Sequence, residues 1–365
     1  MYDDLKYKIG ITLIPKIGAV NAKKLIAYCG GVEAVFKESK KALLKIPGIG
    51  HNLVSNILNQ NVLKRAEQEI EFIEKNNITP LFYTDDKYPQ RLLQCEDAPV
   101  MLYYKGNQSL NPPRMLAIVG TRRSTVYGRS VCEKIIEGLT DKGVMIISGL
   151  AYGIDSCAHR HALKTEMPTV GILGHGLDRI YPAENRSVAE KMLYNGGLLT
   201  EFMSGTIPDR ENFPKRNRII AGISDATLVV ESGKKGGAII TAEIAFSYSR
   251  DVFAVPGKVD DAYSKGCNYL IKTNKAALVE SADDIAYWLG WNDVKPQQTG
   301  QPELFTTLTP DEQKLADILQ QEGECGIDKL MVKSNLPVSK ISVILLNLEF
   351  QGVILSLPGK RYKLK

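Results

Sequence analysis

Five short apolar runs, each ending in glycine, recur through the middle of this sequence and constrain its fold more than any other feature. They are MLAIVG (115–120), VMIISG (144–149), TVGILG (169–174), ATLVVESG (226–233) and VFAVPG (252–257). Apolar strands that alternate with helical stretches pair in parallel and are covered on both faces. Right-handed crossovers then bring the carboxyl ends of the strands to one edge. We therefore predict an α/β fold, a Rossmann-like, doubly wound and mostly parallel sheet, with a ligand site at that edge.

The length of 365 residues predicts two or three domains, at about 150 residues per domain. We place a helical domain at 1–75, the Rossmann-like domain at 76–290, a linker at 291–308 and a C-terminal domain at 309–365. The linker contains Pro, Gln, Gly and Thr without hydrophobic periodicity. An apolar content of 44% and a charged content of 24% are ordinary for globular domains and exclude a disordered or collagen-like chain.

Composition also bears on the cellular compartment. The mean hydropathy is −0.13, and no apolar run reaches the roughly 18 residues that a membrane span requires. The polar start MYDDLKYKIG lacks the apolar stretch of a signal peptide. The six cysteines include no CxxC pair, which indicates reduced thiols rather than a disulfide framework or a zinc site. We expect a cytoplasmic protein without a membrane partner.

The first 75 residues contain two similar segments, LIPKIGAVNAKKLI (13–26) and LKIPGIGHNLVSNIL (44–58). Each has a Pro-x-Ile-Gly turn followed by an amphipathic helix, with Lys16 in the first copy where the second has Gly48. This pattern is typical of a helix-hairpin-helix, whose turn exposes backbone N–H groups that can hold a phosphate. The same pattern also suits a small helical module that only packs on its neighbour.

The C-terminal segment has the pattern of a winged helix. Thr309, Pro310 and the acidic residues after them suit a helix start. Helices are predicted at 311–321, 326–333 and 338–350, followed by a β-hairpin. The third helix carries one Lys and one Glu, so it is poorly equipped to contact phosphates. We expect this domain to contact protein or to pack, rather than to bind DNA.

Basic residues follow several of the predicted strands. Arg122 and Arg123 come after the first strand, and the turn there is not the GxGxxG of a dinucleotide site. FPKRNRIIAG opens a helix with three cations, where the helix dipole disfavours positive charge unless an anion faces it. A Gly-rich loop carries Lys234 and Lys235. Since these cations follow strands of one sheet, they are predicted to meet at one edge and to bind an anion there.

Three further polar residues lie near the same turns. Asp155 and His159 are four residues apart and therefore share a helix face. They suit an acid–base dyad or a pair of metal ligands, but a structural role is the favoured interpretation because no further ligand stands at a telling spacing. His175 lies between two glycines, and we expect it to be exposed near the edge as a polar contact.

Several motifs of this sequence resemble those of a known protein family. IVGTR, SGLAYGIDSCAH, YPAEN, FPKRNRIIAG, the loop ending in IITA, and AVPG occur in the order and approximate spacing typical of the DNA-processing protein family DprA, also called Smf. The resemblance covers about 80–285. It implies a protein that binds single-stranded DNA in a basic pocket of its Rossmann-like domain, protects incoming DNA during natural transformation and helps to load the RecA recombinase. It also implies a homodimer without catalytic activity.

The resemblance and the charge pattern together assign the site. The family's motifs map onto Arg122, Gly149, Gly153, Arg216 and Arg218, whereas Lys234 and Lys235 come from charge and placement alone. The full set expected to bind DNA is Gly120, Arg122, Arg123, Gly149, Gly153, His175, Lys215, Arg216, Asn217, Arg218, Lys234 and Lys235. Bases are expected to stack on Tyr152, Tyr181 or Phe213.

No P-loop, acidic metal cluster or nucleophile with its base is apparent, so we predict no catalytic residue, metal or cofactor. Two alternatives stay open. A phosphoribohydrolase of the LOG type has a Gly-Gly-x-Gly-Thr-x-x-Glu loop, which residues 236–243 echo without its third glycine. A pure adaptor would recruit partners through the two smaller domains and would show no salt-sensitive DNA binding.

Overall fold

A computed structural model of the chain describes residues 2–292, 308–334, 336–350, 353–357 and 361–364. Its contacts divide the chain into two compact units, 1–293 and 294–365. Most of the predicted linker lies outside the described residues. None of the helices in the described ranges has the length and apolar character needed to cross a membrane.

The first unit begins with short helices. They are α1 (Tyr2–Leu13), α2 (Ala19–Cys29), α3 (Val32–Lys37), α4 (Lys40–Leu43), α5 (His51–Leu58) and α6 (Leu63–Lys75). Their apolar faces form one core that also includes Phe82, Val100 and Met101 from the neighbouring sheet. The helical module therefore shares its core with the sheet and does not bury its apolar residues alone.

The two helix-hairpin-helix segments fold alike. Lys16 and Gly48 both have a positive φ, 65° and 80°, so the lysine adopts the left-handed conformation that glycine supplies in the second copy. Asn56 donates a hydrogen bond to Pro15 O at 2.8 Å, and Lys24 donates one to Pro47 O at 3.1 Å. Asn56 and Lys24 are equivalent positions of the two copies, so each copy bonds the other's turn in the same way.

The five Gly-ended runs form parallel strands, as predicted. They are β3 (Arg114–Val119), β4 (Val144–Ser148), β5 (Thr169–Ile172), β7 (Ala226–Val229) and β8 (Asp251–Ala254). Their order in space is β5-β4-β3-β7-β8, and each neighbouring pair is parallel. The chain leaves β3 towards β4 and later returns on the other side to β7. The switch point of the doubly wound sheet therefore lies between β3 and β7.

Four further strands were not predicted: β1 (Thr79–Phe82), β2 (Met101–Gly106), β6 (Gly196–Thr200) and β9 (Ala277–Leu278). They extend the sheet to nine strands in the order β1-β2-β6-β5-β4-β3-β7-β8-β9, with β1, β2 and β6 paired antiparallel. β6 begins with two glycines, which are unfavourable in strands. At Gly196 a Cβ atom would lie 1.8 Å from Thr169 O, so close strand packing requires this glycine.

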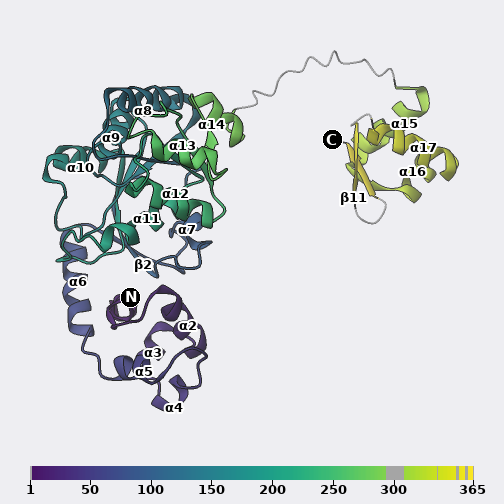
Figure 1. Ribbon diagram of the computed structural model, residues 1–365. Coiled ribbons are helices and arrows are strands. Elements are labelled where there is room, and N and C mark those ends of the chain that lie inside the picture. Colours follow the sequence, from purple (N-terminus) through teal and green to yellow (C-terminus); the bar gives the residue numbers. More distant parts are fainter. Residues whose placement is uncertain (1, 293–307, 335, 351–352, 358–360, 365) are drawn as a thin grey trace. The chain divides into compact units, whose positions relative to one another are not determined.

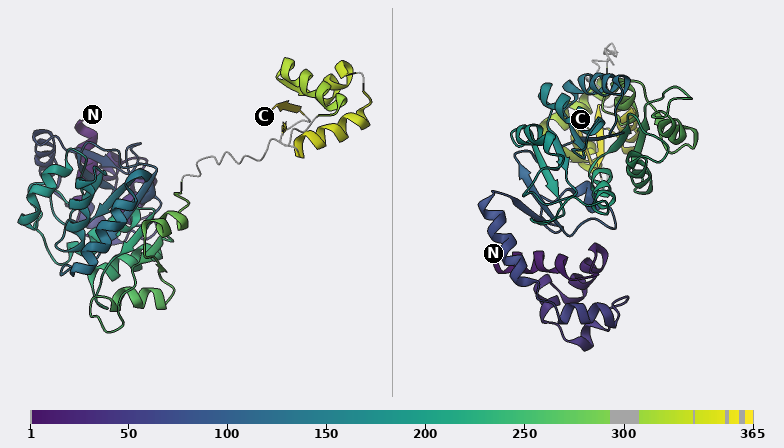
Figure 2. Two further views of the ribbon diagram at one scale, coloured as in Figure 1. Left: turned by 90° about the horizontal axis from the view of Figure 1, so that it is seen from above. Right: turned by 60° about the vertical axis from the view of Figure 1, so that its left-hand side comes forward.

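Helices cover both faces of the sheet (Figure 1). Met115, Ala117 and Val119 of β3 point into one core with the apolar residues of α7 (Gln90–Leu93), α11 (Asn212–Ile223), α12 (Gly237–Ser247) and α13 (Lys265–Lys272). Leu116 and Ile118 point into the other core with α8 (Val126–Gly138), α9 (Ile154–Lys164) and α14 (Ala282–Trp288). A smaller cluster packs α10 (Arg186–Met192) on Leu198 of β6. Figure 2 shows the same layers from two other directions.

The second unit is a winged helix, which confirms the pattern of three helices and a hairpin. Its elements are α15 (Pro310–Glu322), β10 (Glu324–Gly326), α16 (Ile327–Ser334), α17 (Val338–Phe350), β11 (Ile354–Leu357) and β12 (Arg361–Leu364). The predicted helix start is a capping box between Thr309 and Glu312. Lys340, the lysine of α17, forms an ion pair with Asp311 at 2.5 Å.

Candidate nucleic-acid interface

A cleft of about 580 Å³ opens at the carboxyl edge of the sheet, at the switch point. The loop after β3 and the loop after β7 meet there, since Thr121 N donates a hydrogen bond to Glu231 O at 2.7 Å. The predicted site residues that line the cleft are Gly120, Arg122, Arg123, Arg216, Asn217 and Lys235. The structure therefore brings part of the predicted cationic set together.

Two glycines of the predicted site are required by close packing. A Cβ atom at Gly149 would lie 1.7 Å from Nη1 of Arg216 and 2.7 Å from Oδ2 of Asp155. Gly153 has a φ of 78°, and its Cβ atom would lie 2.1 Å from Thr121 O. These glycines let the loop after β4 approach both the arginine and the loop after β3, and thereby shape the cleft.

Arg216 is the buried cation of the cleft, with 4% of its surface exposed. Its Nη1 donates a hydrogen bond to Ile172 O at 2.9 Å, whereas its buried Nε has no hydrogen-bond partner among the described residues. Burial lowers the pKa of Arg216 to about 10, the charge of Asp155 opposes this shift, and the nearby Arg122 adds a smaller lowering effect. The guanidinium therefore stays charged at neutral pH.

Asp155 and His159 are buried residues of α9 that lie near Arg216. Burial raises the pKa of Asp155, and the charge of Arg216 opposes this shift. His159 is fully buried, and its Nδ1 lies 2.7 Å from Oγ1 of Thr169. Burial, with a smaller effect of Arg216, lowers the pKa of His159 to about 3. The two side chains thus have separate partners, which favours the structural role over a dyad.

An aromatic wall stands beside the cleft. The Arg122 guanidinium lies 5.2 Å from the centre of the Phe213 ring, and that ring lies 6.3 Å from the ring of Tyr181. Both rings line a small cavity of about 70 Å³ with Tyr152 and His175. The three aromatic residues expected near the edge are therefore there, and Tyr152 and Tyr181 are half exposed.

The expectation that His175 is exposed is wrong, because only 1% of its surface is accessible. The end of β6 and the segment after it cover the loop of His175: Thr200 Oγ1 donates to His175 O at 2.9 Å, and Gly176 N donates to Thr206 O at 3.1 Å. Burial lowers the pKa of His175, so the imidazole is neutral at pH 7.

The expectation that all the cations meet at one edge is wrong for Lys215 and Arg218. These two residues line a separate cavity of about 390 Å³, together with Ile17 and Gly18 of the helical module. Arg218 also forms an ion pair with Glu201 and donates to Asp97 O. Successive residues of α11 are rotated by about 100°, so Arg216 faces the cleft while Lys215 and Arg218 face away from it.

The Gly-rich loop before α12 contributes one lysine to the cleft, Lys235. Lys234 is exposed on the same loop, with its Nζ 5.8 Å from the ring centre of Tyr269, and does not line the cleft. Sequence reasoning missed Arg210, which does line it. Arg210 precedes the FPKRNR motif by only a few residues, and its charge was the available signal.

Residues 236–243, which partly match the LOG-type loop, do not place an acidic residue at the cleft. Glu243 would be the acid of that motif, but it forms an ion pair with Lys275 at 2.8 Å on α12 and does not line the cleft. Among the described residues no group of three or more His, Cys, Asp or Glu side chains is arranged to hold a metal ion.

Comparison with known proteins places the chain in a family. The family model described as DNA recombination-mediator protein A matches residues 79–290, and the model of the DprA winged helix domain matches residues 298–360. Protein Smf of Synechocystis is 33% identical over 98% of both chains. The DNA processing protein DprA of Streptococcus pneumoniae is 41% identical over 55% of this chain and 71% of its own.

Two solved structures are also similar. DprA of Streptococcus pneumoniae superposes with a TM-score of 0.65 at 34% identity, over 77% of this chain and 97% of that one. DNA processing protein A of Helicobacter pylori, described for its single-stranded DNA binding mode, gives a TM-score of 0.53 at 28% identity, over 58% and 95%. These matches agree with the motifs at the carboxyl edge and with both domains that they cover, and the chain belongs to the DprA/Smf family of DNA-processing proteins.

Proposed function

We propose that this protein binds single-stranded DNA at the carboxyl edge of its sheet, without sequence preference and without breaking a bond. The observation that carries the proposal is the cleft itself. Arg122, Arg123 and Lys235 line it, and none of them has a carboxylate partner within the described residues. Unpaired guanidinium groups suit phosphate oxygens. The Helicobacter pylori relative, which is described for this kind of binding, supports the same ligand.

The DNA-binding set proposed here is narrower than the sequence suggested. Arg122, Arg123, Arg216 and Lys235 are the proposed phosphate contacts, and Gly120, Gly149 and Gly153 shape the backbone around them. Asn217 lines the same cleft. Phe213 with Tyr181 offers a stacking surface for bases, a contact that every base can make.

We base the proposed cellular role on what the resemblance to the DprA/Smf family implies. A protein that holds single strands intact is suited to protect incoming DNA during transformation and to help load the RecA recombinase onto it. A homodimer would bring two such clefts to one strand. Protection, RecA loading and the homodimer are parts of this proposal, and the names of the relatives support a role in DNA processing.

The test is the salt dependence of oligothymidylate binding by the full chain. Single-strand binding loses about 0.7 in log K per log unit of salt for each phosphate neutralised. Arg122→Ala is expected to weaken binding and to make this slope shallower by about 0.7. Arg179→Ala is the matched control, because Arg179 pairs with Asp178 and does not line the cleft. A wild-type slope for Arg122→Ala would contradict the site.

A further inference from the structure

We propose that the bound strand continues beyond the cleft, in a second groove across α8 and α9 that holds its phosphodiester backbone. This inference rests on the proposed function. The groove has a volume of about 820 Å³. It shares Arg122 and Arg123 with the cleft and Tyr152 with the small aromatic cavity, so the three hollows form one continuous surface.

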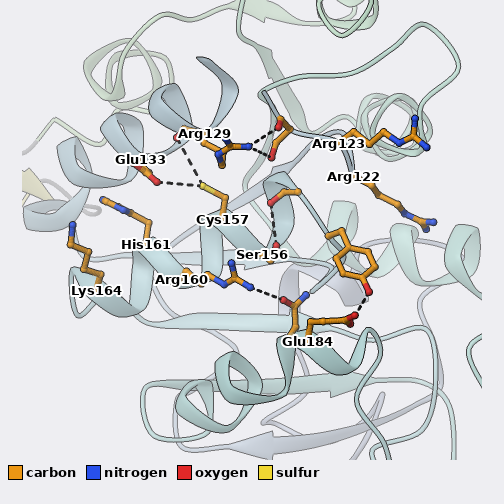
Figure 3. A pocket seen from close by; sticks show the side chains of 14 residues that line it. Arg122, Arg123, Arg129, Glu133, Ser156, Cys157, Arg160, His161, Lys164 and Glu184 are labelled. Atoms are coloured by element: carbon orange, nitrogen blue, oxygen red, sulfur yellow. Dashed lines mark hydrogen bonds between the residues drawn. The ribbon is translucent and has the colours of Figure 1, made fainter. Parts of the chain in front are cut away.

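The groove runs along one face of α9. Ser156, Arg160 and Lys164 all line it, and they are spaced four residues apart on the helix. At 1.5 Å per residue this row is about 12 Å long. Figure 3 shows Arg122 and Arg123 towards one end of the groove and Lys164 at the other. A strand that leaves the cleft at Arg122 therefore meets a row of groups leading away from it.

The cations of this groove are held in place without carboxylate partners. Arg129 on α8 donates to Ser124 O at 2.7 Å, and Arg160 donates to Oδ1 of Asn185 at 3.2 Å. Within the described residues neither these arginines nor Lys164 forms an ion pair. Cations elsewhere on this unit do, as in the pairs Arg91–Asp225 and Lys275–Glu243. Positioned but unneutralised cations favour an anionic ligand.

Two acidic residues also line the groove, and each carboxylate accepts a hydrogen bond from a neighbouring side chain. Glu184 accepts a hydrogen bond from the Tyr152 hydroxyl at 2.7 Å, and Oε1 of Glu133 lies 3.9 Å from Sγ of Cys157. The groove has a net positive charge, because its cationic residues outnumber these two acids: they are Arg122, Arg123, Arg129, Arg160 and Lys164.

The lining also indicates which part of the strand is held. Tyr152 is the aromatic residue of the groove, and it lies at the end nearest the cleft, where the small cavity begins. Beyond it the described lining offers guanidinium, ammonium, hydroxyl and amide groups. The ring in that part of the lining is the imidazole of His161, which is 6% exposed and lies with Nε2 3.0 Å from Oε1 of Glu137, so it presents little surface for a base to stack on. The groove is therefore suited to phosphates and sugars, whereas we expect bases to stack on the aromatic wall formed by Phe213 and Tyr181.

The experiment compares oligothymidylates of about 6 and about 30 nucleotides, a range that spans the site sizes of single-strand binding proteins. The variant is Arg160→Gln with Lys164→Gln in the full chain. We expect wild-type affinity for the short oligonucleotide. For the long one we expect affinity to fall several-fold and the salt slope to become shallower by about 1.4, or 0.7 for each of two phosphate contacts.

The matched control is Lys134→Gln with Lys191→Gln, which removes the same charge from exposed positions of α8 and α10 outside the groove. It should bind both lengths like the wild type. If the groove variant binds the long oligonucleotide as tightly as the control, or if it loses affinity equally for both lengths, the inference is wrong. Arg122→Ala separates the two proposals, because damage to the cleft is expected to lower the affinity for both the short and the long oligonucleotide. A wild-type protein that binds neither length would overturn both.

Discussion

At the residue scale, burial decides what the polar groups of the motifs do. His159 and Arg216 both come from conspicuous motifs, yet each is more than nine-tenths buried. Arg216 keeps its charge beside Asp155 and bonds a strand carbonyl. His159 stays neutral and bonds Thr169. One group therefore supplies charge to the cleft, and the other supports the sheet beneath it.

The buried His159 makes stability depend on pH. Its folded pKa of about 3 lies below the unfolded value of about 6.5, so the unfolded state binds more protons between these values. Stability contributed by neutral His159 is therefore present above pH 6.5 and is lost as the pH falls towards 3. Titration of this one group changes the free energy of unfolding by at most about 1.4 kcal/mol per pH unit. His159→Gln should remove it.

The measurement is urea unfolding between pH 4.5 and 6, followed by tryptophan fluorescence. Both tryptophans lie at the end of the sheet domain, Trp288 on α14 and Trp291 in its core, so the signal reports this domain. His51→Gln, which removes an exposed imidazole from α5, is the control. Equal slopes in wild type and His159→Gln would show that His159 is not a buried neutral group.

At the element scale, backbone conformation and helix rotation matter more than sequence proximity. The two hairpins of the helical module have the same turn although one carries lysine and the other glycine. On α11, rotation separates three cations that adjoin in the sequence: Arg216 faces the cleft, whereas Lys215 and Arg218 face the helical module.

The left-handed turns predict an asymmetry between two substitutions. Gly48→Ala forces a Cβ into a φ of 80°, which costs about 1 kcal/mol, and the Lys24 Nζ 3.2 Å away can move aside. Lys16→Gly removes a similar cost but adds the backbone entropy of glycine, so its net effect should stay within about 0.5 kcal/mol. Amide hydrogen exchange in α5 measures this, with about a fivefold loss of protection expected for Gly48→Ala alone. Equal losses in both variants would contradict the shared turn.

At the scale of the whole molecule, the proposed DNA site lies in the first unit. α17 occupies the position of a recognition helix, but its lysine is paired with Asp311. Its exposed residues include Val343, Leu346 and Phe350. Such a face offers little to a phosphate, so we retain the prediction that this domain does not bind DNA.

A chain ending at residue 293 should therefore bind the long oligothymidylate like the full chain. We expect a dissociation constant within about twofold and the same salt slope, because the cleft and the groove lie entirely in the first unit. Fluorescence anisotropy at several salt concentrations measures both. A shallower slope for the shortened chain would place phosphate contacts in the winged helix.

The parallel strands, their common edge, the winged helix and the family motifs could all be predicted from the sequence, because hydrophobic periodicity, glycine-ended strands and turn chemistry depend on neighbouring residues. The sequence also placed Arg122, Arg123 and Lys235 at the edge, since each directly follows a strand or its loop. Tertiary packing decided the rest. The rotation of α11 turned Arg218 away, the segment after β6 buried His175, and the packing of α8 on α9 created a groove from residues that no single motif contains. Which polar groups face solvent depends on what covers them, and distant parts of the chain supply that cover.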